Sequence, residues 1–216
     1  MKTRNWIFAA VLLPFCSALA LAQSARQGRL VPVTQTGMRA PDEEPADKGD
    51  ATLDAHREKR AMQIFLKIVE NRVVSAADAM PANKYVFAPT DGEFKGVRTF
   101  AQQVKHLAAT NHILAAAALG EEPPADAGDE AGPETVRTKA EILDYLKASF
   151  ARLGKAIDAI DDKNATVKTS PISPLQGTTP TRLGLTVEAL IHAFDHYGQM
   201  VEYLRMNGVV PPASRA

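Results

Sequence analysis

The stretch Val187–Val201, VEALIHAFDHYGQMV, has the apolar spacing of a helix and carries two histidines four residues apart. Four residues of an α-helix rotate by about 400°, so His192 and His196 lie one above the other on one face. This spacing offers two nitrogen ligands to a single metal ion. A third histidine, His106, lies in another apolar segment upstream. Three histidines from two helices leave metal positions open for water or substrate, which favours chemistry over scaffolding.

Outward from this stretch, other segments show the three-and-four apolar spacing of amphipathic helices. Thr99 and Thr138 are each followed three residues later by Gln or Glu, the pattern of a capping box at a helix start. No segment has convincing strand alternation. We therefore expect an all-α fold in which four helices surround one core. The expected helices cover roughly residues 52–79, 100–119, 139–160 and 182–206.

The first residues have the features of a signal peptide. Lys2 and Arg4 precede a short apolar stretch, and Ala20-Leu21-Ala22 is a small-x-small cleavage site. The apolar stretch is too short to span a bilayer, so we expect a periplasmic or secreted protein without stable membrane insertion. A retained N-terminal anchor is the alternative. The expected organisation is a signal peptide over 1–22, a disordered leader over 23–50 and a four-helix domain over 51–212.

Composition excludes several classes of function. The only cysteine, Cys16, lies inside the expected signal, so the mature chain has no disulfide, thiolate ligand, cysteine nucleophile or covalent c-type haem. Removing the signal leaves 23 basic and 25 acidic side chains, because Lys2 and Arg4 are lost from 25 and 25. Without a basic patch or a platform of aromatic side chains, nucleic acid is not expected as a partner.

Two parts of the sequence together resemble the DinB/YfiT-like superfamily, especially its exported DinB-like members. They are residues 98–107, RTFAQQVKHL, and residues 192–205, HAFDHYGQMVEYLR. The resemblance covers roughly residues 65–212. It implies a four-helix bundle whose topology is less common than simple up-and-down. It also implies a divalent metal held by three side chains.

Carried over position by position, the resemblance assigns the metal ligands to His106, His192 and His196. Tyr197 follows the last ligand where members commonly have Arg, so a positive charge that could bind an anion near the metal is missing. Known activities in the superfamily include transfers that involve low-molecular-weight thiols. Those thiols are largely cytoplasmic, so a thiol-dependent activity does not agree with the expected export of this chain.

Two further side chains of the last helix are candidate catalytic residues. Gln199 lies three residues after His196, near the same face, where its amide could hydrogen-bond a bound water or a substrate. Glu188 lies one turn before His192, where it could orient that imidazole or act as a general base. Packing beside the site is the alternative for Gln199, and plain solvent exposure is the alternative for Glu188. His112, about 120° around the helix from His106, is expected outside the site.

The sequence therefore predicts an exported metalloenzyme that performs hydrolysis or nucleophilic transfer on an unknown small-molecule substrate. The cofactor is a divalent transition metal, with zinc or nickel first, although imidazole ligands alone do not choose between metals. The alternative is a non-catalytic metal-binding or structural bundle in the periplasm. The chain is also a candidate homodimer.

Overall fold

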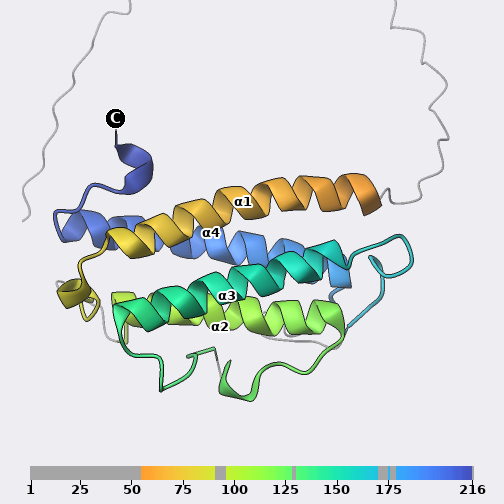
Figure 1. Cartoon of the computed structure of the whole chain (residues 1–216), viewed down its shortest axis with the longest axis horizontal. Coiled ribbons are helices and arrows are strands. Elements are labelled where there is room, and N and C mark those ends of the chain that lie inside the picture. The colour runs from red at the N-terminus through yellow and green to blue at the C-terminus, as the bar shows by residue number, and fades with distance from the viewer. Residues whose placement is uncertain (1–54, 91–95, 128–129, 170–174, 176–178, 216) are drawn as a thin grey trace, which may run out of the picture. The chain divides into compact units, whose positions relative to one another are not determined.

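The computed structural model describes residues 55–90, 96–127, 130–169, 175 and 179–215. Over these ranges the chain forms four long helices, shown in Figure 1. They are α1 (Ala55–Ala79), α2 (Phe100–Leu119), α3 (Lys139–Asp158) and α4 (Arg182–Met206). Extended backbone pairs only at one isolated bridge within the described residues, between Lys168 and Thr181. The predicted all-α class is confirmed.

The expected signal and leader lie outside the described residues, as do the first three residues of the helix expected from 52. Among the described residues, no helix has the length and apolar character needed to cross a membrane.

Helices α1 and α4 are neighbours that run in the same direction (Figure 1). Near their beginnings, the Thr186 hydroxyl donates to the Met62 sulfur over 3.8 Å. Further along both helices, the Arg72 guanidinium lies 6.0 Å from the centre of the Tyr197 ring. Residue numbers therefore rise together along the pair, at an offset of about 125 between contacting positions.

Helices α2 and α3 are also parallel neighbours, and they run opposite to α1 and α4 (Figure 1). Asn111 donates to the Ser149 hydroxyl over 3.3 Å, and Arg152 pairs with Glu121, just after α2, at 2.7 Å. The chain must return along the bundle between α2 and α3 before α3 begins. This up-down-down-up order confirms the expectation of a topology other than simple up-and-down.

Local signals at the helix ends place these elements as the sequence predicts. Both capping boxes form: Thr99 accepts from the backbone of Gln102, Thr138 accepts from that of Glu141, and each partner side chain accepts a hydrogen bond in return. Gly120 ends α2 with φ 76°, a left-handed conformation that glycine adopts without a steric penalty.

One predicted boundary is wrong. The apolar stripe extends to Ile160, but α3 ends at Asp158. The last turn is tighter than an α-helix, because the backbone amide of Ile160 donates to the carbonyl of Ile157. The side-chain amide of Asn164 donates to the carbonyl of Ala159 over 2.7 Å. Ile160 is nevertheless buried, so its apolar character reports burial beyond the helix rather than helical structure.

Contacts between α4 and the segment that precedes α2 fix the positions of α2 and α4 relative to each other. The Tyr203 hydroxyl donates to the carbonyl of Arg98 over 2.9 Å. Phe87 packs edge-on against Tyr203 with ring centres 5.8 Å apart, and Tyr85 packs against Phe100 at 5.2 Å. The start of α2 is therefore fixed against the end of α4, and this positions the histidines described next.

Candidate metal centre

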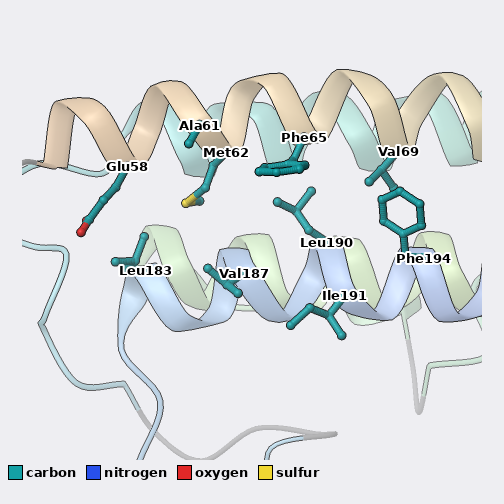
Figure 2. A pocket seen from close by; sticks show the side chains of 10 residues that line it. All are labelled: Glu58, Ala61, Met62, Phe65, Val69, Leu183, Val187, Leu190, Ile191 and Phe194. Atoms are coloured by element: carbon teal, nitrogen blue, oxygen red, sulfur yellow. The ribbon is translucent and has the colours of Figure 1, made fainter. Parts of the chain in front are cut away.

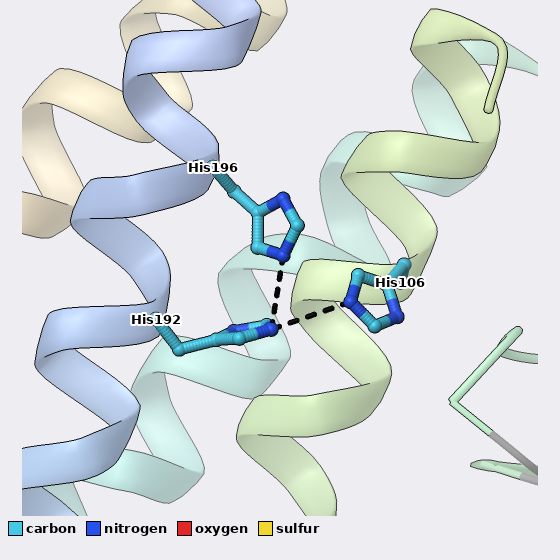
Figure 3. A group of neighbouring side chains, drawn as sticks. All are labelled: His106, His192 and His196. Carbon is cyan, nitrogen blue, oxygen red and sulfur yellow. Dashed lines mark hydrogen bonds between the residues drawn. The ribbon is translucent and has the colours of Figure 1, made fainter. Parts of the chain in front are cut away.

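The imidazoles of His106, His192 and His196 converge between α2 and α4 (Figure 3). The Nε2 atom of His192 lies 2.9 Å from Nε2 of His196 and 3.3 Å from Nε2 of His106. One ring nitrogen from each residue falls within 4.8 Å of the other two. The three positions predicted as ligands therefore form one cluster in space.

The antiparallel arrangement of α2 and α4 explains this convergence. His106 faces His192, and one turn earlier on α2 Gln103 faces His196, which is one turn later on α4. Residues three or four apart share a helix face, so each helix presents two side chains to the other at matching heights. The site is thus a short antiparallel ladder of four side chains.

Burial keeps the three imidazoles neutral. His106 is 5 % exposed and His196 is 6 % exposed, whereas His192 is half-buried. Burial, followed by repulsion from the neighbouring imidazoles, lowers the pKa of His192 to about 4 and the pKa of His196 to about 3. Burial and the nearby Arg98 charge also lower the pKa of His106. Neutral rings at pH 7 have a free lone pair for a metal ion.

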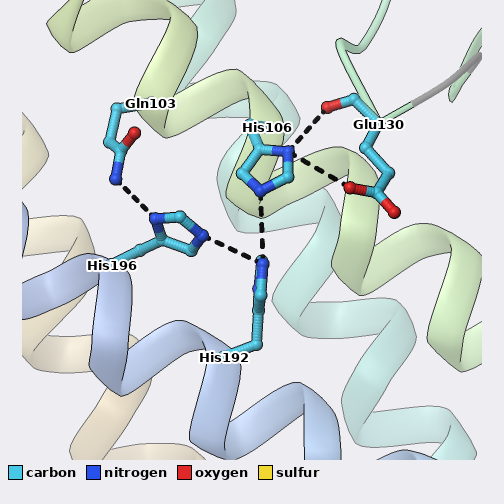
Figure 4. Close-up of polar contacts among 5 residues, drawn as sticks. All are labelled: Gln103, His106, Glu130, His192 and His196. Carbon is cyan, nitrogen blue, oxygen red and sulfur yellow. Dashed lines mark hydrogen bonds and ion pairs between the residues drawn. The ribbon is translucent and has the colours of Figure 1, made fainter. Parts of the chain in front are cut away.

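Gln103 and Glu130 contact the Nδ1 atoms of His196 and His106, on the side of each ring that faces away from the other imidazoles (Figure 4). Nδ1 of His106 donates to the backbone carbonyl of Glu130 over 3.0 Å, and the Glu130 carboxylate lies 3.7 Å from the same nitrogen. The side-chain amide of Gln103 lies against Nδ1 of His196. The proton on Nδ1 of His106 leaves its Nε2 with a lone pair that faces the other two rings.

The donor set fits a divalent transition metal. Two nitrogens that bind one ion at about 2.0–2.1 Å lie about 3 Å apart when the bond angle is about 90–110°, close to the spacings of 2.9 and 3.3 Å. Without a cation, the three Nε2 atoms cannot all be paired by hydrogen bonds among themselves, because each neutral ring has a single proton. Nδ1 of His192 is buried and has no hydrogen-bond partner among the described residues.

Neither of the two candidate catalytic residues is among the three clustered side chains. Gln199 is exposed; its oxygen accepts from Gln103 over 2.6 Å and its amide donates to Asp195 over 2.8 Å. Gln199 thus reaches His196 through Gln103. Glu188 is half-buried on α4. Both catalytic roles stay predictions.

His112 lies outside the cluster, as expected. Its ring packs against that of Tyr145 on α3, with the ring centres 5.0 Å apart and the planes tilted by 37°. Burial lowers the pKa of His112 as well, so a lowered pKa alone does not distinguish the metal site from other buried histidines.

Sequence reasoning missed Gln103 and Glu130. Gln103 had a usable signal, because it lies one turn before His106 and therefore on the same face of α2. Glu130 had none: it lies in the connection between α2 and α3 and has φ 69°, and nothing in its sequence surroundings points toward His106.

With this geometry in place, comparisons with known proteins define the family. The sequence profile of the DinB superfamily matches residues 66–200, more than half of the chain, so the protein belongs to the DinB superfamily. A similar solved structure is that of a DinB-like protein from Bacillus cereus ATCC 10987. It is 15 % identical, has a TM-score of 0.55, and the match covers 71 % of this chain and 95 % of that one. This likeness supports the fold. No curated protein sequence matches the chain.

Proposed function

We propose that this protein is a divalent-metal-dependent enzyme that performs hydrolysis or nucleophilic transfer on a small molecule. The observation that carries the proposal is the convergence of three Nε2 atoms on neutral, mostly buried rings. The cluster contains three potential ligands among the described residues, which matches catalytic sites more closely than the four-ligand structural ones. When bound, such an ion polarises a substrate and lowers the pKa of a bound water toward about 7.

The chain's own residues supply the remaining functions. His106, His192 and His196 hold the ion, and zinc or nickel are the first candidates. The carbonyl of Glu130 fixes which nitrogen of His106 is protonated, and Gln103 positions His196. Gln199, hydrogen-bonded to Gln103, is placed to orient a substrate or a water molecule at the edge of the cluster.

The test is elemental analysis of the purified protein beside single alanine variants of the three histidines. We expect about one equivalent of a transition metal in the wild type and its loss in His192→Ala. His112→Ala is the matched control, because His112 is also a partly buried histidine of the bundle but lies outside the cluster. No metal in the wild type after incubation with Zn²⁺ or Ni²⁺, or equal metal in all variants, would overturn the proposal.

A second measurement separates catalysis from a structural role. After substitution with Co²⁺, azide should shift the visible spectrum if coordination positions are open. An unchanged spectrum would support the alternative of a non-catalytic metal-binding bundle.

We also propose that the chain is exported to the periplasm or secreted. The basic start, the short apolar stretch and Ala20-Leu21-Ala22 support this. Protein recovered from the periplasmic fraction should begin at Gln23. An intact N-terminus in the cytoplasmic fraction would contradict it.

A further inference from the structure

Helices α1 and α4 expose a continuous apolar surface. Six large hydrophobic side chains, three from each helix, are 40–59 % exposed. Soluble monomers rarely leave so many neighbouring apolar side chains in water, and such patches mark contact sites. We call this surface the α1–α4 face; it consists of Ile64, Phe65, Ile68, Val187, Ile191 and Phe194.

A cavity of about 620 Å³ opens on this face between the two helices. Figure 2 shows Phe65 and Val69 on α1 opposite Leu190 and Phe194 on α4. Of the residues that line the cavity, only Glu58 is charged. The hollow therefore offers space for apolar side chains and few hydrogen-bonding groups for a polar ligand.

The two long edges of the face have opposite charge. At about 100° per residue, Arg60 and Lys67 are rotated by about 40–60° from Ile64, on the side away from Phe65, so they lie along the edge of the face that is far from α4. Lys67 also pairs with Glu70 of the same helix at 3.4 Å. On α4, Glu188 and Asp195 are rotated by about 40–60° from Ile191, on the side away from Phe194, so they lie along the edge that is far from α1. Across the face the order is thus basic edge, apolar strip, acidic edge.

We propose that the α1–α4 face is the contact surface of a symmetric dimer, so that its occupant is a second copy of this chain. A twofold axis that lies in the contact plane, parallel to the helices, places α1 on the partner's α4. The basic edge then meets an acidic edge on both sides. The other in-plane axis, perpendicular to the helices, would place basic edge on basic edge, and repulsion disfavours it.

The helix register makes this pairing specific. Met62 lies beside Thr186, and α1 and α4 are parallel, so a twofold axis along them preserves height. Arg60 then lies within four residues of the level of the partner's Glu188, and Lys67 has the same relation to the partner's Asp195. Four residues rise about 6 Å along a helix, a distance that a lysine or arginine side chain can span.

The available area suits a homodimer. The exposed parts of the six side chains amount to roughly 600 Å², taking about 200 Å² for a fully exposed large side chain. Specific interfaces bury about 800 Å² per partner, of which the polar rim supplies a part. None of the six side chains of the face is a proposed metal ligand, so the metal-site proposal and this one can fail separately.

Sedimentation equilibrium of the purified protein over a range of concentrations tests the proposal. We expect a species of twice the mass of the purified chain, and at least a tenfold weaker association for Ile64→Glu. The matched control is Val86→Glu, which changes an apolar side chain that is 78 % exposed away from the face and should leave the dimer intact. Circular dichroism verifies folding, and metal content should be unchanged in both variants.

A charge exchange tests the orientation. Lys67→Glu should weaken the dimer, and Lys67→Glu combined with Asp195→Lys should restore part of the loss. If the wild type stays monomeric over a 100-fold range of concentration, the proposal is overturned. The alternatives are then that the chain's own N-terminal segment covers the face or that the face binds apolar molecules. A dimer that survives Ile64→Glu unchanged also overturns it.

Discussion

The side-chain amide of Gln103 lies against Nδ1 of His196, on the side of the ring away from the cluster of Nε2 atoms (Figure 4). Gln103 is almost fully buried and comes from the same helix as His106. Helix α2 therefore contributes one ligand to the candidate metal centre and also orients a ligand of α4.

We predict that Gln103→Leu weakens metal binding by about 10- to 100-fold, the usual cost of losing a partner behind a ligating histidine. A His196 ring that binds through Nε2 has its proton on Nδ1 and needs an acceptor there. The Gln103 oxygen provides that acceptor once the amides of Gln103 and Gln199 both rotate, which gives up the hydrogen bond from Gln199 to Asp195. Competition with a chromophoric chelator measures the affinity.

Gln103→Glu is the matched control for this variant. Its carboxylate keeps an acceptor at the same place, so affinity should remain within a few-fold of the wild type or increase. Equal weakening by Leu and Glu would show that Gln103 acts through packing and not through the hydrogen bond.

Stability of the metal-free protein should fall as pH drops below about 6.5. The pKa of His192 is lowered to about 4 and that of His196 to about 3, so the unfolded chain, with ordinary values near 6.5, binds more protons in this window. Uptake of protons by the unfolded state favours unfolding, and the stability present above pH 6.5 is lost toward pH 3–4. Urea denaturation in the presence of a chelator at several pH values measures it.

The variant that separates this effect from general acid unfolding carries His192→Ala and His196→Ala together. Its stability should depend less steeply on pH between 6.5 and 4 than that of the wild type. Parallel pH profiles for the two proteins would assign the loss to other groups.

Gly198→Ala should stabilise the protein by about 1 kcal/mol. Gly198 lies inside α4 with ordinary helical geometry, and a Cβ atom added there meets nothing within 4 Å. No neighbouring helix therefore requires glycine at this position, and alanine gains helix propensity without a clash. Thermal unfolding at fixed pH checks the prediction, and a loss of stability would contradict it.

Thr138→Ala should destabilise the protein by about 1 kcal/mol, because it removes the acceptor for the Glu141 amide at the start of α3. The companion variant Thr135→Ala changes an exposed threonine of the preceding connection and should have almost no effect. Chemical denaturation of both compares them directly, and equal stabilities would show that the cap is dispensable.

Much of the fold could be predicted because its signals are local. The capping boxes at Thr99 and Thr138 and the stop at Gly120 depend on residues within one turn, and the structure places the helix ends there. The exception is the end of α3, where Ile160 is buried for reasons outside the helix.

The candidate site likewise has one part that local sequence signals predict and one part that they do not. The pairing of His192 with His196 follows from helical periodicity alone, whereas joining His106 to them required the family resemblance. No local pattern connects positions 86 residues apart. Glu130, in an irregular connection, had no signal at all.

By itself, then, the sequence determined the helices, their caps and the shared face of His192 and His196, because each depends on backbone geometry within a few residues. Only the tertiary structure decided that α2 faces α4 in antiparallel register, which brings His106 and Gln103 to the pair. It also decided that α1 lies parallel to α4, so that separate apolar stripes form one exposed face. These features depend on which helices become neighbours, and packing of the whole core sets that choice.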